Sequence, residues 1–272
     1  MKKLGIAIIS SVLIGLLAGC GAGSTAGKAD KSIKIGATSG PYSDMVSKAI
    51  KPVLEKKGYK VEVVEFSDYI QPNLALSKGD LDANLFQHKI YLDTFNKEHS
   101  LELAELISVP TAPMGIYSKQ FKTLEEIKDG SEIAIPNDPT NAARALLILE
   151  DAGLVKLDPS ANPLTVSEKD VKENVKNLQF KPLEAAQLPR ALDGTDLSAV
   201  PGNFALAAKM NLLDAAVLEK MADQYRNRVA VNEKDLSSEW AKDLKAAVES
   251  DEFEKTMDED FKGFEKPEWM AD

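Results

Sequence analysis

The stretch that decides the fold class is residues 32–66, SIKIGATSGPYSDMVSKAIKPVLEKKGYKVEVVEF. Residues 33–37 and 61–66 are short, mostly apolar segments of the kind that forms buried or half-buried strands, and residues 43–57 between them form a helical stretch. A strand, a helix and a second strand in series are typical of a parallel sheet covered by helices. The stretch therefore predicts an α/β fold.

The same alternation continues and then restarts further along the chain. A short helix over residues 69–78 and a strand over 80–86 follow first; the restart comprises a strand at 132–136, a helix at 139–152 and strands at 178–183 and 197–200. Two such units predict two lobes, each with a largely parallel sheet. Extended segments at 112–118 and 228–231 are placed to cross between them. We therefore assign residues 32–117 and 228–272 to lobe 1 and residues 118–227 to lobe 2, with C-terminal helices covering lobe 1.

The N-terminal residues form a different pattern. Lys2 and Lys3 precede an apolar run over residues 4–17, which is shorter than the roughly 20 residues of a membrane-spanning helix and indicates a secretory signal. The sequence LAGC at residues 17–20 resembles the lipobox of bacterial lipoproteins, which implies cleavage before Cys20 and lipid attachment to it. We predict a signal peptide at 1–19, a flexible tether at 20–31, and a lipid-anchored protein on the extracytoplasmic face of the cell membrane. The alternative is an ordinary secretory signal with an incidental cysteine.

Composition and missing motifs narrow the function. The chain has 33 basic and 43 acidic residues without a basic patch, which argues against nucleic-acid binding. It lacks the sequence signatures of serine hydrolases, zinc proteases and phosphate-binding loops, so we predict no catalytic residue, cofactor or metal. Two alternatives stay open. One is an extracytoplasmic hydrolase that uses paired carboxylates, and the other is a zinc receptor that uses His88 and His99 with Asp82 or Asp93.

The first candidate site is residues 80–92. If residues 80–88 are extended, side chains alternate, so Asp82, Asn84, Phe86 and His88 share one face and Leu81, Ala83, Leu85 and Gln87 share the core face. A helix that begins near Lys89 then adds Tyr91 to the first face. Polar and aromatic residues at the carboxyl end of a strand are typical of a ligand pocket. The alternative is an amphipathic helix with an exposed histidine.

The second candidate site is residues 136–144, PNDPTNAAR. Asn137 or Asp138 can cap a helix that has Pro139 in its first turn. Arg144 has no acidic residue three or four positions away. Together with Asn141, one turn earlier, it could hold a ligand carboxylate, or it could pair with a distant acid.

Four motifs occur in a fixed order behind the lipobox: DYIQPN at residues 68–73, DANLFQHKIYL at 82–92, IPND with Asn141 and Arg144 at 135–144, and QLPR at 187–190. Together they resemble the methionine-binding lipoprotein family of bacterial ABC importers, the NlpA type. The resemblance implies a two-lobed periplasmic-binding-protein fold, type II-like, with hinge crossings. It also implies a monomer that closes over a small amino-acid-like ligand and delivers it to a membrane permease driven by a cytoplasmic ATPase.

The resemblance also implies the ligand-binding residues. Tyr69, Phe86, His88 and Tyr91 would line the side-chain pocket, Asn141 and Arg144 would hold the α-carboxylate, and Asn227 would contact the ligand. Pro201 stands where methionine-type members commonly have asparagine, so that contact is either missing or supplied by Asn203. L-methionine is the first expectation for the ligand. D-methionine, another amino acid or a methionine-containing dipeptide remains open.

Overall fold

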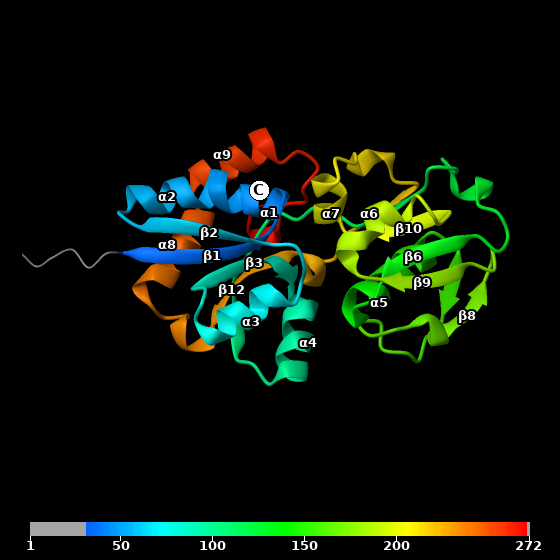
Figure 1. Cartoon of the computed structure of the whole chain (residues 1–272), viewed down its shortest axis with the longest axis horizontal. Helices are drawn as coiled ribbons and strands as arrows, with labels where there is room; N and C mark the ends of the chain where they lie inside the picture. Colours follow the sequence, from blue (N-terminus) through cyan, green and yellow to red (C-terminus); the bar gives the residue numbers. More distant parts are fainter. Residues whose placement is uncertain (1–30, 271–272) are drawn as a thin grey trace, which may run out of the picture.

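The computed structural model describes residues 31–270, and it has two lobes side by side along the long axis of the molecule (Figure 1). Each lobe contains a five-stranded sheet with helices packed against it. The predicted two-lobed α/β fold is confirmed. The predicted signal peptide, Cys20 and the tether up to residue 30 lie outside the described residues.

The first lobe is built on a mixed sheet, so the prediction of a largely parallel sheet is only partly correct: β1 is parallel to both β2 and β3, whereas β12 pairs antiparallel with both of its neighbours, β3 and β4. β12 enters the sheet from the second lobe. The end of the sheet at which β3 ends with His88 and β12 begins with Asn227 therefore faces the second lobe. The strand order is β2 (Lys60–Phe66), β1 (Ser32–Thr38), β3 (Ala83–His88), β12 (Asn227–Asn232) and β4 (Leu103–Ser108).

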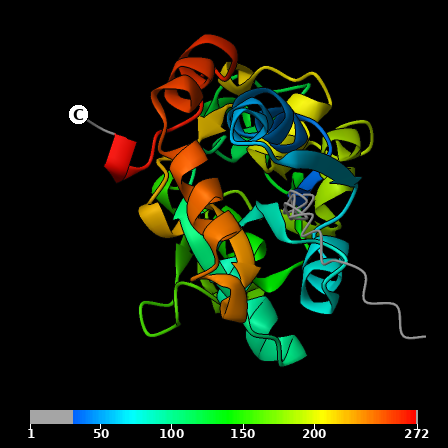
Figure 2. The same ribbon diagram turned by 90° about the vertical axis from the view of Figure 1, so that its left-hand side faces the viewer.

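The helices of the first lobe cover both faces of this sheet. A π-helical turn, Val46–Ile50, interrupts the first helical stretch just before Pro52, which has no N–H for the regular ladder. The predicted C-terminal helices lie along the outer side of the lobe (Figure 2) and bury Leu244 and Phe253 in its core. The helices are α1 (Pro41–Met45), α2 (Lys51–Lys56), α3 (Gln71–Lys78), α4 (Lys89–His99), α8 (Glu239–Val248) and α9 (Asp251–Asp260).

The second lobe also has a five-stranded mixed sheet, but its strands are shorter. β6 lies between β9 and β10 and is parallel to both, and β5 is antiparallel to β10 and β11. The order is β11 (Val217–Leu218), β5 (Gly115–Tyr117), β10 (Leu197–Val200), β6 (Glu132–Pro136) and β9 (Gln179–Leu183), beside a hairpin of β7 (Val155–Leu157) and β8 (Val171–Asn174). Its helices are α5 (Pro139–Asp151), α6 (Leu188–Ala191) and α7 (Gly202–Ala207). Within residues 31–270, no helix has the length and apolar character needed to cross a bilayer.

The two crossings between the lobes differ from those predicted. β5 belongs to the second sheet and β12 to the first, so the crossings are residues 109–114 and 219–226. The predicted crossings at 112–118 and 228–231 are wrong by a few residues, because their ends pair with strands and extend a sheet. The C-terminal segment lies on the first crossing, where Thr111 and Glu265 exchange backbone hydrogen bonds of 3.1 and 2.9 Å.

The start of α7 packs tightly on the first crossing. A Cβ atom on Gly202 would lie 2.5 Å from the carbonyl oxygen of Pro113 and 2.6 Å from the Cβ of Ala112. We expect Gly202→Ala to lower the free energy of unfolding by about 1–3 kcal/mol, because the backbone of the crossing must move. Urea unfolding measures this change. Gly194→Ala is the matched control, because its Cβ would meet nothing within 4 Å; equal effects of the two substitutions would contradict the packing argument.

Candidate ligand-binding site

A cavity with an empty volume of about 320 Å³ lies between the lobes. Its walls come from the end of β3, the start of β12, the first crossing, and the first turns of α5 and α7. The structure brings together every residue that the sequence predicted for ligand binding: Tyr69, Phe86, His88, Tyr91, Asn141, Arg144, Asn203 and Asn227 all line this cavity. Apart from His88, Arg144 is the sole ionisable side chain of the basic or acidic type among the lining residues.

An aromatic wall closes the cavity on the side of the first lobe. The ring centroid of Tyr69 lies 5.7 Å from that of Phe86 and 5.9 Å from that of Tyr91, and the Phe86 and Tyr91 rings are also 5.9 Å apart. Most of these contacts are edge-on or tilted, as is favourable for aromatic pairs. The hydroxyl group of Tyr91 donates to the carbonyl oxygen of Tyr69 at 3.0 Å, so the wall is fixed by hydrogen bonding as well as by packing.

The predicted strand alternation is only partly correct. Gln87 pairs with Arg228 and Leu85 pairs with Val229, so the register of the β3–β12 pair shifts at Phe86. An extra residue of this kind re-aims the side chains around it. Gln87 therefore leaves the predicted core face. Phe86 and His88 still share the cavity wall as predicted, whereas Asp82 is remote from it and accepts a hydrogen bond from the N–H of Lys34 at 2.6 Å.

Gln87 lines the cavity and also joins a cluster of buried amides. Its side chain exchanges two hydrogen bonds with that of Asn73, at 2.6 and 2.7 Å, and donates to the Oδ1 atom of Asn84 at 3.1 Å. Since buried amides must find partners, this cluster fixes α3 against β3.

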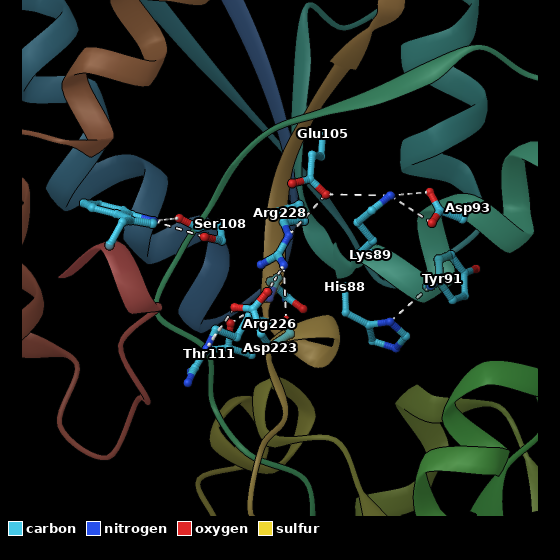
Figure 3. A network of polar contacts seen from close by, with 12 residues as sticks. His88, Lys89, Tyr91, Asp93, Glu105, Ser108, Thr111, Asp223, Arg226 and Arg228 are labelled. Carbon is cyan, nitrogen blue, oxygen red and sulfur yellow. Dashed lines mark hydrogen bonds and ion pairs between the residues drawn. The ribbon is translucent and has the colours of Figure 1, made fainter. Parts of the chain in front are cut away.

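His88 is held as a neutral imidazole. Its Nδ1 atom accepts a hydrogen bond from the N–H of Tyr91 at 3.1 Å (Figure 3), so Nε2 carries the proton and donates to Oδ1 of Asn141 at 3.2 Å. Burial, together with the nearby Arg144 charge, lowers the pKa of His88 to about 3.

The described residues do not support the alternative of a zinc receptor. Residues 31–270 contain no group of three or more histidine, cysteine, aspartate or glutamate side chains arranged for a metal ion. His99 lies away from the cavity, and its ring stacks on Phe95 with 4.1 Å between the ring centroids.

Arg144 pairs with a distant acid and also lines the cavity. Its Nε atom donates to Oε1 of Glu219 at 2.6 Å, and its Nη2 atom donates to Oε2. Both side chains are buried, and the guanidinium carbon lies 5.2 Å from the centre of the Tyr225 ring. The pair uses the Nε–H group and one N–H group of Nη2, so both N–H groups of Nη1 and the second one of Nη2 remain to serve the cavity. Of the two alternatives left open by the sequence, the distant ion pair therefore forms, and it leaves part of the guanidinium available.

Asn141 connects the two lobes through hydrogen bonds. Asp138, one of the two caps that the sequence allowed, caps α5 by accepting from the backbone N–H of Asn141 at 2.9 Å. The Nδ2 atom of Asn141 also donates to the Asp138 carboxylate, so its Oδ1 atom is left to accept from His88 in the first lobe. Burial raises the pKa of Asp138.

Asn203 makes a second connection between the lobes. The hydroxyl group of Tyr69 donates to its Oδ1 atom at 2.7 Å, whereas its Nδ2 atom is buried with no hydrogen-bond partner among residues 31–270. On the other side of the cavity, Asn227 donates through Nδ2 to the carbonyl oxygen of Phe86 at 2.9 Å.

Charged residues fix the second crossing next to the cavity. The Nη2 atom of buried Arg228 lies 2.9 Å from a carboxylate oxygen of Asp223, and its Nε atom lies 3.4 Å from one of Glu105. Lys89, the first residue of α4, lies between Asp93 and Glu105 at 2.9 and 3.9 Å (Figure 3). These ion pairs link the crossing to the strand-to-helix junction that carries His88.

Comparisons with known proteins agree with this site. The family model described as NlpA lipoprotein matches residues 33–269. The chain belongs to the NlpA lipoprotein family. A Salmonella typhi protein named D-methionine-binding lipoprotein MetQ is 40% identical over 250 residues, covering 91% of each chain.

Solved structures are similar to this NlpA family member over almost all of their length. One is a nutrient binding protein from Burkholderia cenocepacia bound to methionine, with a TM-score of 0.81, 40% identity, and coverage of 85% of this chain and 97% of that chain. Another is an ABC transporter, periplasmic substrate-binding protein from Coxiella burnetii, with a TM-score of 0.81, 35% identity, and coverage of 86% and 99%. The resemblance predicted from the four motifs is confirmed.

Sequence reasoning missed several residues of this NlpA family site. Tyr42 and Thr111 line the cavity, and Glu219 and Tyr225 contact Arg144. Tyr42 follows the first strand closely, and its position near the carboxyl end of a strand was a usable signal. Glu219 offered none, because it lies 75 positions from Arg144 in an unremarkable loop sequence.

The buried neutral His88 should make stability depend on pH. The unfolded chain binds a proton at this residue below about pH 6.5, whereas the folded chain does so only near pH 3. The unfolded state therefore binds more protons between these values, and the free energy of unfolding falls as pH is lowered. We expect a loss of about 2 kcal/mol between pH 7 and pH 5, measured by urea unfolding. His88→Gln should remove most of this loss, and the exposed His99→Gln control should retain it; identical pH profiles for the two variants would refute the assignment.

Proposed function

We propose that this NlpA family member is the lipid-anchored substrate-binding protein of an ABC importer, and that it binds L-methionine or a close relative without chemical change. The observation that carries the proposal is a small cavity between two lobes, with an aromatic wall from one lobe and the hydrogen-bond donors of Arg144 and Asn203 from the other. An amino acid with an apolar side chain fits such a cavity, because its side chain can pack on the aromatic wall while its carboxylate accepts from the donors.

The aromatic wall suits a thioether side chain. Sulfur is polarizable and makes favourable contacts with the edges of aromatic rings, and Tyr69, Phe86 and Tyr91 all line the cavity.

The polar groups suit the head group of an amino acid. Nη1 of Arg144 and Nδ2 of Asn203 are donors and would bind the α-carboxylate with Asn141 beside them. Asn227 uses its amide nitrogen on Phe86, so its Oδ1 atom is the acceptor that would take the ammonium group. Pro201 supplies no side-chain polar group, and Asn203 takes over the contact that asparagine makes at that position in methionine-type members.

Binding would close the two lobes about the crossings. The hydrogen bonds His88–Asn141 and Tyr69–Asn203 each join one lobe to the other, as expected for a closed arrangement. A ligand that contacts both lobes favours the closed state. We propose a moving unit near residues 32–108 plus 227–270 and a second near 115–218, with the crossings between them.

The similar proteins support the ligand class and the transport role. The Salmonella typhi relative is named for D-methionine, and the Burkholderia cenocepacia structure contains methionine. The Coxiella burnetii structure is described as part of an ABC transporter. By this proposal Cys20 carries the lipid on the extracytoplasmic face, a permease with its ATPase receives the ligand from the monomer, and D-methionine or a methionyl dipeptide is the alternative ligand.

A ligand panel tests the proposed function. L-methionine, D-methionine, the other amino acids and methionyl dipeptides would be screened by thermal shift, then by calorimetry. At 100 times its dissociation constant the true ligand should stabilise the protein by about 2.7 kcal/mol. Mass spectrometry should recover the ligand unaltered, since a hydrolase would cleave the dipeptides. Failure of every methionine compound to raise the melting temperature would refute the proposal.

A paired substitution tests the carboxylate contact. Arg144→Ala alone would leave the buried Glu219 without a partner, which typically costs about 3–5 kcal/mol and confuses loss of binding with unfolding. The double variant Arg144→Met with Glu219→Gln removes both charges, and the new amide can still accept from the N–H of Met114. We expect it to fold and to bind methionine at least about 100-fold more weakly. Arg190→Met, at an exposed arginine, should bind normally; full affinity of the double variant would refute the assignment.

A further inference from the structure

Glu219 is a buried acid that the proposed head-group contacts do not use. Its side chain is about 5% exposed, it does not line the cavity, and both of its oxygens bind Arg144. Oε2 also accepts from the backbone N–H of Met114 at 2.9 Å. A buried carboxylate of this kind is costly unless it is paired, so its presence beside the cavity calls for a reason.

The pair controls which part of Arg144 can reach a ligand. A free guanidinium grips a carboxylate with two parallel N–H bonds. Here the Nε–H group and one N–H group of Nη2 bind Glu219, which leaves for the cavity the edge formed by Nη1 and the second N–H group of Nη2. Contact with a ligand carboxylate is therefore limited to one edge of the guanidinium, in an orientation that Glu219 sets.

The pair also sets the net charge around the ligand. Arg144 is the sole charged group that lines the cavity, and Glu219 neutralises it. Two other ionisable residues lie close by, and neither supplies a positive charge: Asp138, the N-cap of α5, is an acid, and His88 is neutral. Arg228, the next arginine, is itself paired with Asp223 and Glu105. A ligand with a net negative charge would therefore enter a buried site that has no net positive charge to match it.

We propose that Glu219 is a positioning and specificity-determining residue: by holding Arg144 and cancelling its charge, it makes the site select a ligand with balanced α-ammonium and α-carboxylate charges over the corresponding carboxylate anion. This inference rests on the proposed function, because it takes methionine as the ligand.

Glu219 also joins the site to the hinge. Its backbone N–H donates to the carbonyl oxygen of Met114 at 2.9 Å, and its side chain accepts from the N–H of the same residue. Met114 ends the first crossing and Glu219 begins the second. The side chain of Glu219 thus joins Arg144 of α5 to Met114 of the first crossing, and Glu219 itself belongs to the second crossing.

The test compares two ligands that differ only in the ammonium group. Calorimetry at neutral pH would measure the dissociation constants of L-methionine and of 4-(methylsulfanyl)butanoate, its desamino anion. The wild type should bind methionine at least about 100-fold more tightly than the anion. In Glu219→Gln the site gains one net positive charge, so the ratio of the two constants should fall at least about tenfold in favour of the anion.

Control variants separate charge from structure. Glu219→Asp keeps the charge on a shorter side chain, so it should weaken both ligands while the ratio stays within about threefold of the wild type. Glu219→Met, an uncharged variant of similar length, repeats the neutral test if Glu219→Gln does not fold. A Glu219→Gln protein that binds both ligands more weakly by the same factor would overturn the inference, because a purely structural role predicts that result.

The wild-type measurement separates this inference from the proposed function. If the wild type binds methionine and the desamino anion equally well, charge selection is wrong although methionine binding stands. If the wild type binds neither, the proposed function itself fails.

Discussion

The ion pair between Arg144 and Glu219 lies where α5, the first crossing and the second crossing meet, and the binding site depends on it. Both charges are buried, so each would be strongly destabilising without the other. The N–H group of Met114 donates to the same carboxylate and ties the pair to the hinge. One side chain thereby fixes the orientation of the ligand-facing arginine, neutralises it, and connects it to the segments about which the lobes would move.

Neutral groups make the remaining direct side-chain hydrogen bonds between the lobes at the cavity. His88 donates to Asn141, and Tyr69 donates to Asn203. A neutral hydrogen bond contributes only about 0.5–1.5 kcal/mol net, because water replaces it when the lobes part. Such contacts can align the closed state without locking it. This suits a protein that must bind its ligand and then release it to a permease, as we propose.

The aromatic wall is supported by a cluster of buried amide side chains next to it. The register shift at Phe86 turns Gln87 toward Asn73 and Asn84, and the three amides satisfy one another in the buried interior. An apolar residue at position 87 would leave the Nδ2 donor of Asn73 without its acceptor, although the Oδ1 atom of Asn73 would still accept from Asn84. The wall that would face a thioether is therefore positioned by a polar cluster, while its own contacts are aromatic.

The sequence by itself determined what depends on neighbours a few residues apart. Strand and helix periodicity predicted the α/β lobes, the cap of α5 was narrowed to Asn137 or Asp138, and the motifs around His88 and Arg144 named residues that meet in one cavity. Tertiary structure alone decided the pairing of Arg144 with Glu219, the register shift beside Phe86, and the ends of the crossings. The physical reason is that these features arise from contacts between segments far apart in the chain. Local periodicity carries no information about which distant acid reaches a buried arginine or which strand pairs with Gly115–Tyr117.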